Sequence, residues 1–454
     1  MNVRWDAAVG RARSWRVLGL AALVVSVPAV VVAAPSSGAR PGAAKPAMAH
    51  GAHSFPDVAA ASRPGTVQPA AVTSATDLAL ELQKLLGQHA VLAAELMRSR
   101  MRDDPDLAQA ANAAVGKNTR DMAAVVAGLG GPQAAQGFST QWSTHVAALF
   151  NYARGLATDD RQARDQAKST LLTYEGRVGR DMEASTGGAL SADEVTKALT
   201  MHVNELIEEA DAFKAGDYTR VYTVQRHAHD HMFELGATMA AGFSKAAGTP
   251  TSGLDGARWR LRSSLAKALS EHAVLTVQAM RARVVNAPEF AAAAAALDAN
   301  TSDLAGTIGA VYGDQAGQRF QSLWADHLDA FMAYADAARG NDAAAREKAK
   351  STLSGFQGDF AKFLDQASDG KLPASSLAAA FAEHDDMLLE QVDAYAAKSY
   401  PQAHDLAYDA YQDVFGMSTS FAGAIADVAG SRLPLGGAQT GGGGTATQDH
   451  PHGG

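Results

Sequence analysis

The chain has 454 residues, 47% of them apolar, and a formal charge of −9. This apolar share is enough to build buried cores, so a wholly disordered chain is excluded. The negative charge and the lack of a basic stripe argue against a nucleic-acid partner. The absence of cysteine excludes disulfides, cysteine-ligated zinc, iron–sulfur clusters and cysteine nucleophiles.

The first 39 residues (1-39) have the pattern of a signal peptide for export. Arginines at positions 4, 11, 13 and 16 precede an apolar run over 17–34, and small residues follow it. We expect cleavage, which places the mature protein in the cell envelope or outside the cell. A retained signal would anchor the chain through its apolar run, and this is the only membrane contact the sequence predicts. No protein partner is indicated.

Two further terminal segments have compositions typical of disorder. Residues 40–74 are rich in Pro, Ala, Gly and Ser, and residues 431–454 combine a glycine run with the ending DHPHGG. We expect a disordered lead-in and a disordered Gly/His tail around the folded part of the chain.

The folded part consists of two related halves. The segment LGQHAVLAAELMRSR around His89 recurs as LSEHAVLTVQAMRAR around His272, and Asn118 recurs 182 positions later as Asn300. The segment 248–257, GTPTSGLDGA, has the composition of a linker. We therefore predict helical domains over 75–247 and 258–430.

A finer repeat within the first half predicts its helices. His89, His145 and His202 are 56 and 57 positions apart, and an aspartate follows each one 15 positions later. These aspartates are typical N-caps of a following helix: Asp104, Asp160 and Asp217. We predict an all-α chain with two tandem six-helix domains, each of three αα-hairpins. Ferritin-like or hemerythrin-like bundle packing is one arrangement compatible with this pattern.

The repeated histidines lie on the apolar faces of their helices and are expected to point inward. In each hairpin, a residue 28 or 29 positions after the histidine should lie at the same height on the returning helix. In the first half these partners are Asn118, Tyr174 and His231, and in the second half Asn300, Phe356 and Asp413.

Several imidazoles that converge in a bundle core are typical of a transition-metal site. His227 and His231 are four residues apart and should share a helix face with the layer, whereas His229 should be exposed. For copper or zinc, the predicted ligands in the first half are His89, His145, His202 and His231, assisted by His227. In the second half the candidates are His272, His327, His384, Asp409 and Asp413, for a harder ion or a His–Asp ion pair.

Two other hypotheses fit the same residues. In one, the histidines form a hydrogen-bonded layer that only fixes the packing of an envelope scaffold. In the other, the bundle holds two metal ions or a haem for oxygen or redox chemistry. No catalytic motif is present, since Glu-x-x-His, His-Glu-x-x-His, Gly-x-Ser-x-Gly and Walker patterns are all missing. The alanine run 291–296 is interpreted as helix filler.

Several landmarks resemble a family of exported, helical bacterial proteins that often carry the label copper amine oxidase. They are EHAVL at 271–275, the pattern FxxxWxxH at 138–145 and 320–327, and DYTRVY…HMF at 217–233. The resemblance covers about residues 75–430 and implies a helical fold and export. It does not imply the oxidase reaction, because genuine copper amine oxidases are β-rich and build their cofactor within Asn-Tyr-Asp/Glu. Here Asn151-Tyr152 is followed by Ala153.

Overall fold

The computed structural model describes residues 74–430, and this part of the chain is all-helical, with eleven α-helices and no β-strand. The helices are α1 (Ala75–Met101), α2 (Pro105–Ala157), α3 (Arg161–Ser185), α4 (Ala192–Ala215), α5 (Tyr218–Ala246), α6 (Ala257–Val284), α7 (Phe290–Tyr312), α8 (Asp314–Arg339), α9 (Ala343–Ala367), α10 (Ala374–Ala396) and α11 (Tyr400–Ala429). A short 3-10 helix, Ser252–Asp255, lies in the predicted linker.

The predicted aspartate caps begin three of these helices. Asp104 accepts a hydrogen bond from the backbone N–H of Leu107, and Asp160 and Asp217 accept equivalent bonds at the starts of α3 and α5. Each bond satisfies an amide that has no partner within its own helix. The repeated aspartates therefore cap the starts of helices, as the sequence predicts.

A glycine interrupts α2 at its midpoint. Gly131 has φ 83° and ψ 176° and is followed by Pro132, which supplies no amide hydrogen to the helix. Gly313, 182 positions later, has φ 92° and separates α7 from α8. The same conformation at equivalent positions bends one long helix in the first half and divides two helices in the second.

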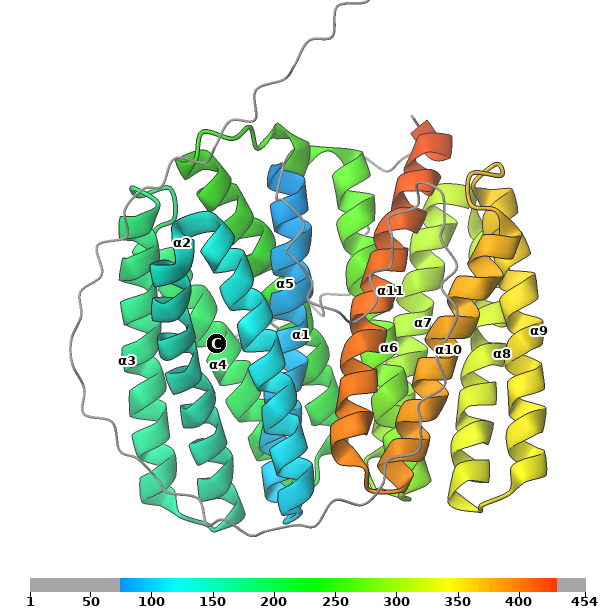
Figure 1. Ribbon diagram of the computed structural model, residues 1–454, viewed down its shortest axis with the longest axis horizontal. Helices are drawn as coiled ribbons and strands as arrows, with labels where there is room; N and C mark the ends of the chain where they lie inside the picture. Colours follow the sequence, from blue (N-terminus) through cyan, green and yellow to red (C-terminus); the bar gives the residue numbers. More distant parts are fainter. Residues whose placement is uncertain (1–73, 431–454) are drawn as a thin grey trace, which may run out of the picture.

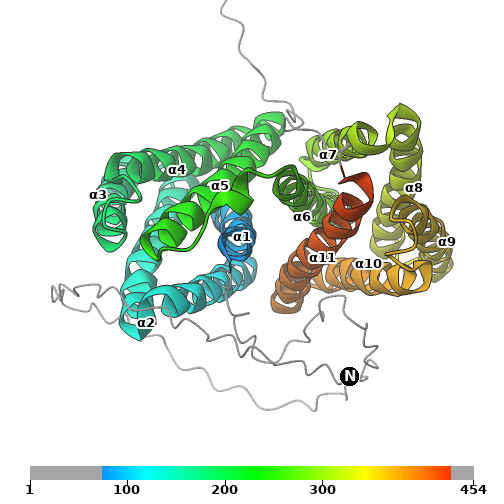
Figure 2. The same ribbon diagram turned by 90° about the horizontal axis from the view of Figure 1, so that it is seen from above.

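The helices form two groups that lie side by side, α1 to α5 and α6 to α11 (Figures 1 and 2). In the first group α1 packs against α2 and α5, and in the second α6 packs against α7 and α11. The apolar core is continuous between them, because Tyr222 of α5 belongs to the same buried cluster as Leu265 of α6. The linker therefore joins two groups that share a core.

Three predicted segments fall outside the described part of the chain: the signal peptide 1–39, nearly all of the lead-in, and the tail 431–454. Within residues 74–430, no helix combines the length and the apolar character needed to cross a bilayer.

Charged side chains are buried in the seam between the two groups. Glu95 of α1 lies 3.2 Å from Arg98 and 3.7 Å from Arg281 of α6. Arg98 also lies 3.0 Å from Glu209, and Arg281 donates to the amide oxygen of Gln391 at 3.0 Å. Burial by itself would raise the pKa of Glu95, but Arg98 and Arg281 outweigh this effect and lower it to about 2.

Replacement of Glu95 by Gln tests this seam. Because the folded pKa is depressed, the ionised carboxylate stabilises the fold above its unfolded value of 4.5, and the contribution is lost as the pH falls toward 2. We expect Glu95→Gln to lower the free energy of unfolding at pH 7 by about 3 kcal/mol. The difference from wild type should shrink progressively between pH 4.5 and 2, as followed by urea unfolding.

Glu81→Gln is the control, because Glu81 pairs with Lys84 of its own helix near the surface. It should change stability by less than about 1 kcal/mol. An equal loss in both variants would show that the seam adds nothing beyond a surface ion pair.

Helices α1 and α5 approach closely at a glycine. A Cβ atom at Gly236 would lie 2.7 Å from the backbone nitrogen of Gln83, so no larger residue fits unless a helix moves. This contact lets the two helices pack backbone to backbone beside the seam.

Substitution of this glycine should separate α1 from α5. We expect Gly236→Ala to lower the free energy of unfolding by about 1–3 kcal/mol through overpacking. Gly416 of α11 is helical and has open space around its Cα, so Gly416→Ala should instead stabilise by about 0.5–1 kcal/mol. Thermal unfolding of both variants would reveal the opposite signs, and a neutral Gly236→Ala would contradict the close approach.

Candidate metal centre

Three histidines from three helices meet in the core of the first group. His89 of α1, His145 of α2 and His202 of α4 are each at most 1% exposed. Their ring centroids are 5.5–5.9 Å apart, and one ring nitrogen from each lies within 4.8 Å of the others. The prediction that these histidines point inward and form one layer is confirmed.

The polar atoms of this triad lack partners within the protein. Neither ring nitrogen of His89, His145 or His202 has a hydrogen bond to any described residue. Burial lowers the pKa of all three imidazoles, and that of His145 to about 4. The rings are therefore neutral at pH 7, and each offers a nitrogen lone pair.

Aromatic side chains surround the triad. Trp142 lies 4.6 Å from His89, ring centroid to ring centroid, and Tyr174 stacks on His145 at 4.9 Å. Tyr174 therefore lies at the height of His145, as predicted. The indole Nε1 of Trp142 is buried without a hydrogen-bond partner among the described residues.

Two of the three histidines in the middle of α5 face other directions than predicted. His229 is 1% exposed and lies beside Tyr411 of α11, whereas His227 is exposed. The expectation of an inward His227 and an exposed His229 is wrong, because α5 also packs against the second group of helices and buries a second face. His231 is partly buried, and its Nδ1 lies 3.1 Å from Glu205.

The second group contains an equivalent triad, His272, His327 and His384, but its ring nitrogens make hydrogen bonds that the first triad lacks. The rings of His272 and His327 are 5.2 Å apart, and Trp324 donates from Nε1 to Nδ1 of His272 at 3.3 Å. Nδ1 of His327 donates a hydrogen bond to the Trp324 carbonyl at 2.7 Å. The His327 ring stacks on that of Phe356, with ring centroids 4.4 Å apart. His384 is also buried, but the three rings do not bring one nitrogen each within 4.8 Å.

The two carboxylates predicted beside this second layer are separated. Asp413 lies near it, with Oδ2 at 3.7 Å from Nδ1 of His384. Asp409 instead pairs with Lys117 of α2 at 2.8 Å. The prediction that Asp409 and Asp413 share one site is wrong, because Asp409 faces the first group of helices.

One other set of side chains has metal-ligand spacing within residues 74–430: His229, Asp230 and Glu271. Its negative charge is already balanced by the protein. Glu271 binds Arg226 through both carboxylate oxygens at 3.0 and 3.1 Å, and Asp230 binds Lys267 at 2.9 Å. An ion at this point would compete with two resident cations.

The sequence interpretation missed the buried arginines and the tryptophans. Arg98 and Arg281 lie nine positions after His89 and His272, and this repetition was an available signal. The different hydrogen bonding of Trp142 and Trp324 could not be predicted, since the two residues occupy equivalent positions in the repeat and differ only in their contacts.

Comparisons of the chain with protein-family models, with curated proteins and with solved structures gave no significant match.

We predict that a His→Leu substitution changes the free energy of unfolding of the metal-free protein in opposite directions in the two triads. His145→Leu removes two buried, unpaired ring nitrogens and should raise the free energy of unfolding by about 1 kcal/mol. His327→Leu, 182 positions later, removes the hydrogen bond to the Trp324 carbonyl and should lower it by about 1 kcal/mol. Chemical denaturation in the presence of a chelator measures both values, and a shared sign would contradict the contrast.

Proposed function

We propose that this protein binds one copper or zinc ion through His89, His145 and His202. The observation that supports the proposal most is the convergence of three neutral imidazoles whose six ring nitrogens are all buried and have no hydrogen-bond partner among the described residues. An unpaired buried polar group costs about 1–3 kcal/mol, and a shared ion would remove this cost for one nitrogen of each ring. Copper and zinc are the ions that imidazole ligands suit.

The role that fits this site best is storage or delivery of the ion. The triad is enclosed, its surroundings are aromatic, and no carboxylate belongs to the ligand group that would act as a general base. His231 and Glu205 form a separate pair, and His227 is exposed, so we assign neither histidine to the ion. Export to the cell envelope is part of the same proposal and rests on the N-terminal sequence pattern.

We also propose that the two groups of helices are copies of one six-helix unit, each made of three hairpins. The equivalent glycines at 131 and 313, the capping aspartates, and equivalent tyrosine–aspartate bonds support this. Tyr152 bonds Asp211 and Tyr334 bonds Asp393, both at 2.8 Å. In the second copy, the polar layer serves packing, because Trp324 already bonds a ring nitrogen of His272.

Metal loading during refolding tests the proposed site. Because the triad is at most 1% exposed, an ion reaches it only while the chain folds or opens locally. Protein refolded with copper or zinc and then desalted should retain one ion per chain by elemental analysis. In a parallel measurement with free metal present at 100 times Kd, the free energy of unfolding should rise by about 2.7 kcal/mol.

The matched control compares two triple variants. His89→Ala, His145→Ala and His202→Ala together should abolish the bound ion, and the equivalent changes at His272, His327 and His384 should leave it in place. Circular dichroism would verify that both variants fold. Sub-stoichiometric metal in the wild type, or equal loss in both variants, would refute the site and leave the scaffold hypothesis.

A further inference from the structure

Helix α5, which contributes no residue to the triad of the first group, carries a pair of histidines near the protein surface. His227 and His231 are four residues apart within this helix, so their side chains are neighbours on one face of it. His227 is exposed, and the side chain of His231 is 12% exposed. Solvent therefore reaches both imidazoles, in contrast to the enclosed triad.

A carboxylate of α4 orients the second of these rings. Oε2 of Glu205 lies 3.1 Å from Nδ1 of His231. Because a carboxylate only accepts hydrogen bonds, Nδ1 of the neutral His231 ring carries the hydrogen, and Nε2 carries the free lone pair. Metal-binding histidines commonly have this arrangement, in which a carboxylate on one ring nitrogen fixes the tautomer and the orientation of the ring. The contact with Glu205 thus prepares His231 to coordinate a metal ion through Nε2.

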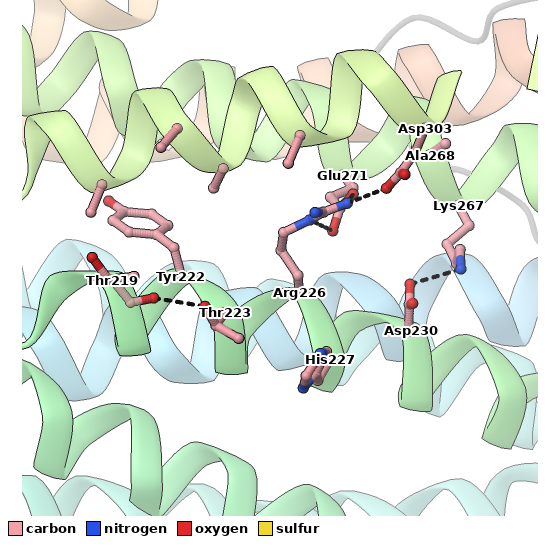
Figure 3. A pocket seen from close by; sticks show the side chains of 14 residues that line it. Thr219, Tyr222, Thr223, Arg226, His227, Asp230, Lys267, Ala268, Glu271 and Asp303 are labelled. Atoms are coloured by element: carbon pink, nitrogen blue, oxygen red, sulfur yellow. Dashed lines mark hydrogen bonds and ion pairs between the residues drawn. The ribbon is translucent and has the colours of Figure 1, made fainter. Parts of the chain in front are cut away.

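The cation next to His227 along the chain is already bound to carboxylates. A cavity of about 230 Å³ lies between α5, α6 and the alanines of α7, and Arg226 binds Glu271 at 3.0 Å and Asp303 at 2.7 Å beside it. Figure 3 shows Arg226 reaching these carboxylates on one side of α5, whereas the imidazole of His227, at the edge of the cavity, points away from them. The guanidinium is therefore turned away from an ion held by His227.

The second half of the chain does not repeat this set of side chains. The positions 182 residues after the two histidines and the glutamate hold Asp409, Asp413 and Met387. Asp409 is bound by Lys117 at 2.8 Å, and Met387 has no carboxylate that could orient a ring. The arrangement therefore predicts one such site per chain.

We infer that His227 and His231 bind a second metal ion, copper or zinc, at the surface of α4 and α5, with Glu205 as the positioning residue of His231. Two imidazoles four residues apart on a helix can coordinate one ion, and water completes its coordination. Imidazole ligands suit both metals.

This second ion is distinct from the ion proposed for the triad. With only two protein ligands and access to solvent, the surface ion exchanges readily, so desalting removes it. Glu205 lies one helical turn after His202 on α4, which places the surface site beside the buried triad. The inference goes beyond the proposed function and does not require the triad to hold a metal ion.

Calorimetric titration of the folded, tag-free full chain with zinc chloride tests the surface site. We expect one site per chain with a dissociation constant in the micromolar range. His227→Ala removes an exposed ligand and should abolish this binding, as should His231→Ala. The terminal histidines at 50, 53, 450 and 452 stay in every variant, so zinc bound to them is common to all titrations. An unchanged titration in both variants would overturn the inference.

A variant with altered spacing is the matched control. His227→Ala combined with Thr223→His keeps the number of histidines but places the pair eight residues apart, about 12 Å along the helix. Thr223 is exposed, so the double variant should fold as the wild type does, which circular dichroism verifies. It should lose zinc binding as completely as His227→Ala alone. Retained binding would show that the spacing is irrelevant, which would contradict a shared ion.

The positioning role of Glu205 has its own test. Glu205→Ala should weaken zinc binding by about 10–100-fold. Nitrogen NMR of the His231 ring should show hydrogen on Nδ1 in the wild type and a shift toward the other tautomer in this variant, a change that a merely structural role does not produce. Glu208→Ala is the control, because Glu208 of the same helix binds Arg220 at 2.6 Å. Equal effects of the two variants on binding and tautomer would refute the role of Glu205.

The triad variants separate this site from the proposed function. The triple change His89→Ala, His145→Ala and His202→Ala should leave the zinc titration of the folded protein intact. Conversely, His227→Ala should leave the ion retained after refolding and desalting in place. Loss of the surface titration in the triple variant, with the fold verified by circular dichroism, would overturn the inference, because the two sites would then be one.

Discussion

The buried seam between α1 and α6 constrains the positions of both triads. Glu95 lies between Arg98 of its own helix and Arg281 of the facing helix, so the ion pairs fix the relative register of α1 and α6. His89 and His272 lie on these same helices, each nine residues before its arginine. Because nine residues of helix span about 13.5 Å, each histidine layer lies at a set height above the charged seam. The two layers are therefore held at matching heights in the two groups of helices.

Buried ion pairs of this kind add little net stability compared with apolar residues of similar size, because desolvation offsets most of the attraction between the charges. Removing one partner is still costly, since the other charge stays in the core. The seam also restricts which residue types can occupy equivalent positions in the two halves. Arg98 and Arg281 are kept, while the partner of Arg98, Glu209, is replaced at the equivalent position by Gln391, which still accepts a hydrogen bond. Away from the seam, Lys117 and Ala299 show that equivalent positions have diverged in size and charge.

Sequence periodicity was enough to predict the all-helical fold and the inward histidines, because both depend on local rules. It did not predict that residues 105–157 form one bent helix, which leaves five helices in the first group where six were expected. An apolar face and a capping aspartate act within one helix and its turn, as at Asp104 and Asp160. The faces of His227 and His229 were not predictable in this way, because α5 packs against both groups of helices and therefore has two buried faces. The alanines of α7 were interpreted as filler, and only the packing of α5 against α7 makes them the wall of a cavity. Local sequence patterns do not predict the contacts between the two halves.

One difference between the triads is the hydrogen bond of an indole N–H. In the second group, Nε1 of Trp324 donates to Nδ1 of His272 and occupies the lone pair that a metal ion would need there. In the first group, Nε1 of Trp142 has no partner among residues 74–430, and both nitrogens of His89 are unpaired within the same part of the chain. A nitrogen whose lone pair accepts a hydrogen bond cannot coordinate a metal at the same time. The same tryptophan–histidine pair thus supports a packing layer in one copy, whereas in the other it leaves the imidazoles available, at a cost in stability that a bound ion would remove.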